Sequence, residues 1–110
     1  MFDVIMVPVD GSEYGYAAAD VAIEIAQKFS SRIAAVHVLE EFSFSSYDSE
    51  EDSGDEILAK ITNKAAEFNV EVVEHLLTAD ALRDMKFIVD QTRADLVVIH
   101  AHGANNNRFV

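Results

Sequence analysis

Short strand-like runs alternate with helical stripes along this chain, and that alternation constrains the fold more than any other feature. The β-branched, apolar runs fall at 3–9, 32–39, 70–77 and 95–101. Between them, apolar residues recur at spacings of three and four, which is typical of one face of a helix. The repeated order of strand, helix and strand predicts parallel strands joined by right-handed helical crossovers.

Three sets of apolar residues define the predicted helices. The first helix is predicted to bury Ala18, Val21, Ala22, Ile25, Ala26 and Phe29. The second is predicted to bury Ile57, Leu58, Ile61, Ala65 and Phe68. The third is predicted to carry Ala81, Leu82, Met85, Ile88 and Val89, with Thr78 or Asp80 as its N-cap. A chain of 110 residues with this content is expected to form one domain over 1–110.

Composition excludes several classes of protein. The absence of cysteine rules out a disulfide scaffold, a thiolate zinc site and a cysteine nucleophile. A net charge of −12 argues against nucleic-acid binding, which needs clustered Lys and Arg. No apolar run approaches the roughly 18 residues of a membrane span. Because the chain opens without a basic region, we expect no signal peptide, no membrane contact and a cytoplasmic location.

The segment 40–53 differs from the rest of the chain, because it combines Ser, Asp and Glu with few apolar residues. We expect a flexible acidic loop, with 42–53 as the most mobile internal segment. Its aromatic residues, Phe42, Phe44 and Tyr47, could cover the mouth of a site or meet a partner protein. The other interpretation is a solvated flap without a specific role.

The predicted topology points to one place for a ligand. Parallel sheets bind ligands beyond the carboxyl ends of their strands, where the strand order reverses. If the first strand is central, the site lies between its end, 9–11, and the end of the fourth strand, 102–103. This argument gives the place and not the ligand.

Four segments resemble the universal stress protein (UspA-like) family. They are VPVDGSE at 7–13, VHV at 36–38, EHLLTAD at 74–80, and ADLVVI at 94–99 followed by His102 and Gly103. The resemblance implies a Rossmann-like α/β fold with helices on both faces of a parallel sheet. Strands one and four are apolar on both faces and the third alternates, so the expected order is 3-2-1-4. The family's fifth strand is missing from this sequence.

The resemblance also implies a function. It suggests a stress-response regulatory module rather than an enzyme, with an adenine-nucleotide pocket, a homodimer and a protein partner as expectations. The implied nucleotide-binding residues are Val9, Asp10, Val38 and Gly103. Each has a structural alternative: Val9 and Val38 as core residues, Asp10 as a turn residue, and Gly103 as a turn glycine.

The sequence departs from the family's phosphate-binding motif, written G-x-x-G-x9-G-S/T. His100 stands at the first glycine, Gly103 at the second, and the third would fall at residue 113, beyond Val110. The chain is either a fragment or a natural short form. We therefore predict that ATP binds this chain weakly or not at all. The alternative function is an ATP-independent protein-interaction module of the same fold.

Histidine and serine residues raise two further hypotheses. His100 and His102 share one side of a strand and, with Asp10, could form a metal site, but no third ligand is placed by spacing, so we expect no metal. Ser12 lacks a nucleophile elbow and is interpreted as a helix cap. His37 and His75 lie inside apolar strands and are interpreted as structural residues.

Overall fold

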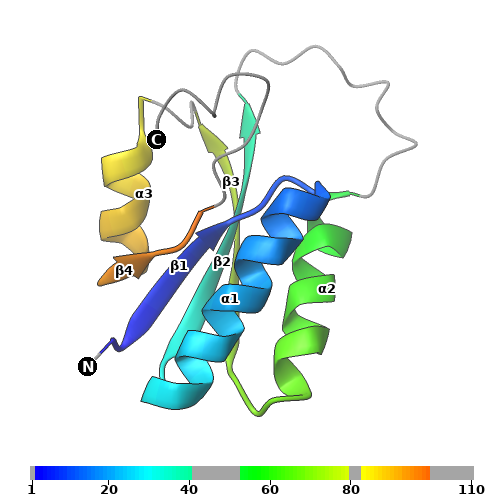
Figure 1. The fold of residues 1–110 in the computed structure, drawn as a ribbon. Coiled ribbons are helices and arrows are strands. Elements are labelled where there is room, and N and C mark those ends of the chain that lie inside the picture. The colour runs from blue at the N-terminus through cyan, green and yellow to red at the C-terminus, as the bar shows by residue number, and fades with distance from the viewer. Residues whose placement is uncertain (1, 41–52, 80–82, 100–110) are drawn as a thin grey trace, which may run out of the picture.

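The computed structural model describes residues 2–40, 53–79 and 83–99, which form a four-stranded parallel sheet with three helices (Figure 1). The elements are β1 (Val4–Pro8), α1 (Glu13–Phe29), β2 (Arg32–Glu40), α2 (Gly54–Ala66), β3 (Val72–Ala79), α3 (Met85–Thr92) and β4 (Leu96–Val97). The strand order is β3-β2-β1-β4. The predicted α/β class and strand order are therefore confirmed.

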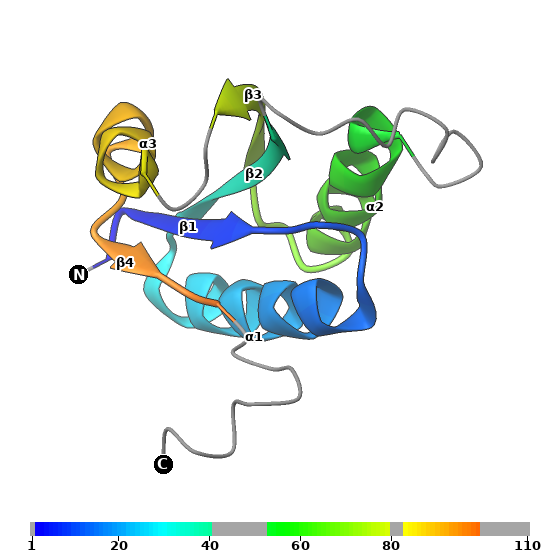
Figure 2. The ribbon, with the colours of Figure 1, turned by 90° about the horizontal axis from the view of Figure 1, so that it is seen from above.

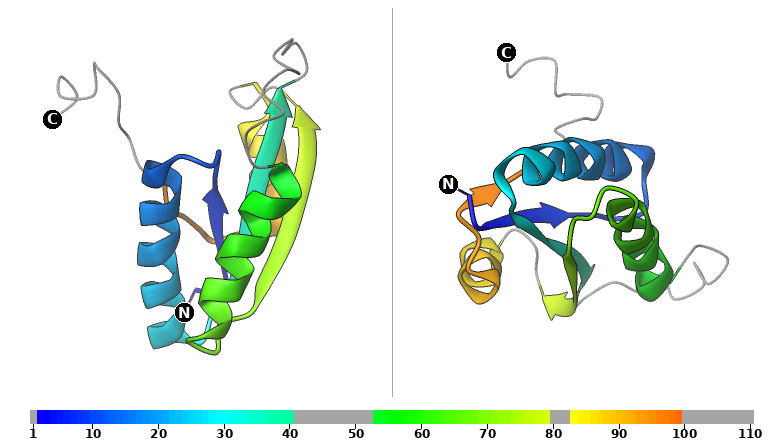
Figure 3. Two further views of the ribbon diagram at one scale, coloured as in Figure 1. Left: turned by 90° about the vertical axis from the view of Figure 1, so that its right-hand side faces the viewer. Right: turned by 90° about the horizontal axis from the view of Figure 1, so that it is seen from below.

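The helices cover the two faces of the sheet unequally. Helices α1 and α2 lie on one face and α3 lies on the other (Figures 2 and 3). The chain moves in one direction from β1 through β2 to β3, and right-handed crossovers then place α1 and α2 on the same face. The return from β3 to β4 reverses direction, so α3 lies on the opposite face. None of the helices in the described ranges is long and apolar enough to cross a membrane.

The central strand β1 supplies both halves of the core. Ile5 and Val7 belong to the cluster under α1 and α2, whereas Val4 and Met6 belong to the cluster under α3. All four side chains are at most 6% exposed. The prediction that the first strand is apolar on both faces is confirmed, and β1 is fixed in place by burial on both sides.

The predicted face of the first helix is partly wrong. Val21 is 48% exposed and Phe29 is 41% exposed, whereas Ala19 and Ile23, which were not in the predicted stripe, are buried. The buried face of α1 consists of Ala18, Ala19, Ala22, Ile23 and Ala26, so the helix turns Ile23 toward the core and Val21 away from it. Phe29 instead packs edge-to-face against Phe2, with ring centroids 5.3 Å apart.

The second helix follows its predicted pattern except at one residue. The buried residues of α2 are Ile57, Leu58, Ile61 and Ala65. Phe68 is 40% exposed, because the helix ends at Ala66 and Glu67 is its C-cap. Apolar spacing alone does not reveal that the last residue of a stripe lies beyond the helix.

The third strand begins and ends later than predicted. It spans Val72–Ala79 rather than 70–77, because its pairing with β2 continues to the last pair, Glu40 with Ala79. Thr78 is therefore a strand residue and not a helix cap. Helix α3 begins at Met85 with Asp84 as its N-cap, and the predicted helical residues 80–82 lie outside the described residues.

The fourth strand is shorter than predicted. It spans Leu96–Val97, and one further bond, from the Val98 N–H to the Met6 carbonyl at 3.0 Å, continues its contact with β1. The remainder of the predicted strand, 100–101, lies outside the described residues, as does the acidic segment 41–52, so the prediction of mobility there is untested.

Candidate functional site

The turn after β1 is built by two side chains that bind backbone groups. The Asp10 carboxylate accepts a hydrogen bond from the Ser12 N–H at 2.9 Å. The Ser12 hydroxyl accepts one from the Gly15 N–H at 3.2 Å, and Ser12 is the N-cap of α1. The predicted capping role of Ser12 is confirmed. Asp10 is exposed, at the carboxyl end of β1 and the start of a helix.

Two glycines let this turn lie against its neighbours. Gly11 has a φ of +91°, and a Cβ atom there would lie 2.9 Å from Cδ1 of Ile57. A Cβ atom on Gly15 would lie 3.3 Å from Oδ1 of Asp10. The backbone of 10–15 therefore packs close to α2 on one side and to the Asp10 carboxylate on the other.

His37 holds the end of β1 in position. Its Nδ1 atom lies 2.9 Å from the carbonyl oxygen of Val9, and because a carbonyl only accepts, Nδ1 carries the proton. Helix α2 begins directly against this ring: a Cβ atom on Gly54 would lie 2.8 Å from Cδ2 of His37 and 2.5 Å from Leu76. The structural role predicted for His37 is confirmed, and the ring joins β2, the end of β1 and the start of α2.

Val38 lies where β2 extends past β1. The last residue of β2 that pairs with β1 is Val36, whose carbonyl accepts from the Val9 N–H at 2.8 Å. Backbone polar groups of a strand alternate between its two neighbours. The N–H and C=O of Val38, two residues later, are therefore directed to the side of β1 but past its end. This gives the site a backbone donor and acceptor on one residue.

The side chains of Val9 and Val38 pack in different apolar clusters. Val9 is 5% exposed and packs in the cluster under α1 and α2, whereas Val38 packs against the cluster under α3. Around the end of β1 the structure brings together the Val9 carbonyl, the Asp10 turn and the Val38 backbone. Gly103, His100 and His102 lie outside the described residues.

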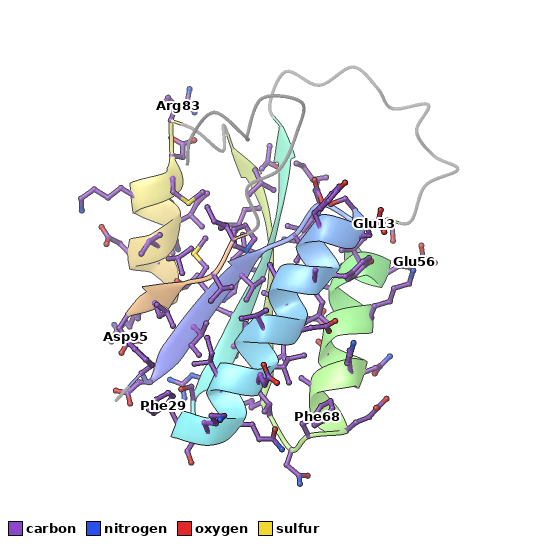
Figure 4. All side chains as sticks on the ribbon, viewed as in Figure 1. Glu13, Phe29, Glu56, Phe68, Arg83 and Asp95 are labelled. Carbon is purple, nitrogen blue, oxygen red and sulfur yellow. The ribbon has the colours of Figure 1, made fainter. Side chains whose placement is uncertain are left out.

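Acidic groups dominate this end of the sheet. Figure 4 shows Glu13 at the start of α1 and Glu56 at the start of α2, both at the end toward which β1 points. Arg83 lies at the start of α3 at the same end, and its guanidinium donates two hydrogen bonds of 2.9 Å to the Asp84 carboxylate. Within the described ranges, no group of three His, Asp or Glu side chains is arranged to hold a metal ion.

Sequence reasoning missed two parts of this site. It did not identify the bond from His37 to Val9, although a histidine next to Val38 inside an apolar strand was a usable signal. It also named Val38 without identifying that the N–H and C=O of this residue are directed past the end of β1.

The comparisons with known proteins agree on one family. A curated universal stress protein of Methanocaldococcus jannaschii is 26% identical over 113 residues, which cover 94% of this chain and 66% of that protein. This chain thus spans about two thirds of the length of that relative.

Solved structures share the fold. The universal stress protein UspA of Lactobacillus plantarum superimposes with a TM-score of 0.79 at 21% identity, covering 98% of this chain and 83% of that one. A universal stress protein family protein of Arabidopsis thaliana with AMP bound gives a TM-score of 0.72 at 22% identity, covering 94% and 79%. The model of the universal stress protein family matches residues 1–110, and the chain therefore belongs to the universal stress protein family.

Proposed function

We propose that this chain is a non-enzymatic regulatory module of the stress response that binds an adenine nucleotide at the carboxyl ends of β1 and β2. The observation that carries the proposal is the direction of the Val38 N–H and C=O, past the end of β1. Adenine presents the N6 donor beside a ring-nitrogen acceptor, so one residue's backbone can bind that edge of the base. The AMP-bound relative of the same fold supports this choice of ligand.

The same site is poorly suited to a triphosphate. The chain carries a net charge of −12, and Asp10, Glu13 and Glu56 lie at this end of the sheet. Arg83, also at this end, is already bound by Asp84. His100 replaces a glycine of the family's phosphate motif. We therefore propose that AMP binds at least as tightly as ATP, and that ATP binds weakly or not at all.

The second candidate is an ATP-independent protein-interaction module. The observation that favours it is Phe87, a large apolar residue on α3 that is 65% exposed. In either case we propose a homodimer in the cytoplasm, on the basis of the family resemblance.

Calorimetric titration with AMP, GMP and ATP–Mg²⁺ separates these functions. We expect saturable binding of AMP, weaker binding of GMP because its base reverses the donor and acceptor pattern, and no gain from the additional phosphates of ATP. Absence of saturable AMP binding would overturn the nucleotide proposal in favour of the interaction module. ATP binding more tightly than AMP would overturn the proposed phosphate preference.

A pair of variants locates the binding site. Asp10→Ala removes the carboxylate that shapes the turn, and we expect AMP affinity to fall about tenfold, equivalent to about 1.4 kcal/mol. Glu24→Gln removes one negative charge from the exposed face of α1 and should leave AMP affinity unchanged. Equal effects of the two variants would point to long-range charge instead of a local contact.

A further inference from the structure

A small cavity lies near the amino ends of β1 and β2, on the face of the sheet that α3 covers. Its volume is 160 Å³, and its floor includes the buried side chains of Val4 and Ala34. Arg32, His75 and Arg93 also line it. It lies where β1 and β2 begin and where α3 ends, which Figure 1 shows to be the end of the sheet away from the turn that follows β1.

The cavity is basic in an otherwise acidic protein. The chain has 8 Lys and Arg against 20 Asp and Glu, yet two arginines line this cavity and no Asp or Glu does. Lys64, Arg83 and Lys86 each form an ion pair with an aspartate. Arg32 and Arg93 form none with any carboxylate in the part of the chain that the structure describes. Arg32 also borders Asp3 and Glu71 at a second cavity, but it is paired with neither carboxylate.

Two of the neighbouring acidic side chains are engaged elsewhere. The Asp95 carboxylate accepts hydrogen bonds from the N–H groups of Asp3 and Val4, at 3.0 and 3.1 Å. Glu74 lies on the opposite face of β3 and accepts a bond from Thr62 of α2. The carbonyl end of α3 contributes the negative end of a helix dipole, which Arg32 and Arg93 partly offset.

We propose that this cavity binds a small organic anion, a carboxylate or a phosphate monoester on a short apolar group. A guanidinium group presents a planar fork of donors that matches either anion with two bonds. Arg32 and Arg93 both line this cavity, together with His75 and Gln91, so the residues around it can supply donors to an anion. Val4, Ala34 and Val73 supply an apolar surface for the rest of the ligand.

Three probes test the proposal by titration of ¹H–¹⁵N NMR spectra: phenylacetate, phenyl phosphate and the uncharged benzyl alcohol. We expect saturable shifts at the amides of Arg32, His75 and Arg93 with one or both anions, at a dissociation constant of about 1 mM. The anion that binds more tightly identifies the chemical class. No saturation by either anion, or equal binding of benzyl alcohol, would overturn the proposal.

Matched variants assign the effect to the arginines. Arg32→Gln should weaken anion binding about tenfold, and Arg32→Lys, which keeps the charge but loses the fork, should weaken it less. Arg93→Asn should act like Arg32→Gln, since asparagine tolerates the left-handed backbone at a φ of +61°. Lys86→Gln removes an equal charge from α3 outside the cavity and should have no effect. If Lys86→Gln weakens binding as much as Arg32→Gln, the anions are attracted by charge alone and the proposal fails.

This inference is independent of the proposed nucleotide site. Asp10→Ala should weaken AMP binding about tenfold and leave phenylacetate or phenyl phosphate binding unchanged. Weakened AMP binding with unchanged anion binding would support two separate sites. Parallel weakening of both would place the anion at the carboxyl ends of the strands and overturn the assignment to this cavity.

Discussion

The Nδ1 atom of His37 lies 2.9 Å from the carbonyl oxygen of Val9. This bond joins a side chain of β2 to the last carbonyl before the Asp10 turn, at the point where backbone pairing of the two strands ends. The Val9 carbonyl thus binds the His37 ring at the position where the next backbone hydrogen bond between β1 and β2 would fall. This side-chain hydrogen bond therefore helps to fix the orientation of the turn relative to Val38.

Two substitutions at His37 separate its bond from its volume. His37→Leu fills a similar space without a donor, and we expect a loss of about 1 kcal/mol of unfolding free energy, together with about tenfold weaker AMP binding. In His37→Asn, the amide nitrogen can take the place of Nδ1, so AMP binding should be closer to wild type. Denaturant titration measures the stability and calorimetry the affinity.

His75→Leu is the matched control, since it removes a histidine of β3, which β2 separates from β1. It should leave AMP affinity unchanged. AMP affinity that falls equally in His37→Asn and His37→Leu would show that the bond to Val9 is not what matters.

The close contact between Gly11 and Ile57 gives a second prediction. Gly11→Ala introduces a Cβ atom 2.9 Å from Cδ1 of Ile57 and requires a φ of +91° from a residue that disfavours it. We expect a loss of about 1–3 kcal/mol of unfolding free energy, the usual range for a strained backbone position.

Adding Ile57→Val removes the crowded methyl group and isolates the two causes. In the Gly11→Ala background, Ile57→Val should cost less than it does alone, because it relieves the clash, while the backbone strain remains. Strictly additive free energies of unfolding would show that the contact carries none of the effect. The measurement is a double-mutant cycle in denaturant.

The fold class and the strand order were predictable because they depend on patterns that extend over whole elements. The unbroken apolar run at 4–7 requires burial on both faces, and that places β1 in the middle of the sheet. Ser12 was predictable as a cap because a serine directly before a helical stripe is typical of an N-cap.

The remaining details depend on contacts between distant parts of the chain. The residues around Thr78 do not reveal that this part of the chain is a strand. Thr78 belongs to β3 because β2 continues to Glu40 and pairs with β3 as far as Ala79. The burial of Ile23 depends on which side of α1 packs against the core cluster formed by β1, β2 and α2. The direction of the Val38 N–H and C=O past the end of β1 follows from where β1 stops relative to β2, a register that no single segment contains.

The start of α2 provides a third prediction. Ser53 is its N-cap and forms a capping box with Glu56, in which each side chain binds the other residue's N–H, at 3.3 and 3.0 Å. Ser53→Ala should lower the free energy of unfolding by about 1 kcal/mol. Asn63→Ala, at an exposed position within α2, should not lower it. Because the two halves of the box support each other, Ser53→Ala and Glu56→Ala should be less than additive.

The fourth prediction concerns Asp95, which fastens the edge strand β4 to the central strand at the amino end of the sheet. Hydrogen bonds from the N–H groups of Asp3 and then Val4 lower the pKa of the Asp95 carboxyl below its ordinary value. A carboxyl whose pKa is lower in the folded state stabilises the fold above its unfolded pKa, about 3.9. That stabilisation is lost as the pH falls through the folded-state pKa.

Asp95→Asn removes this titration, so the variant should be less stable than the wild type at pH 7 by a small margin, since the group is exposed. The difference in denaturation midpoint should shrink below a pH of about 3.9 and disappear once the wild-type carboxyl is protonated. Denaturant titrations at a series of pH values give the comparison. A difference that stays constant from pH 7 to pH values below the folded-state pKa would mean that the charge of Asp95 does not strengthen its bonds to the start of β1. In that case the instability of Asp95→Asn would come from the missing second oxygen, because an asparagine amide has only one oxygen to accept from the two N–H groups.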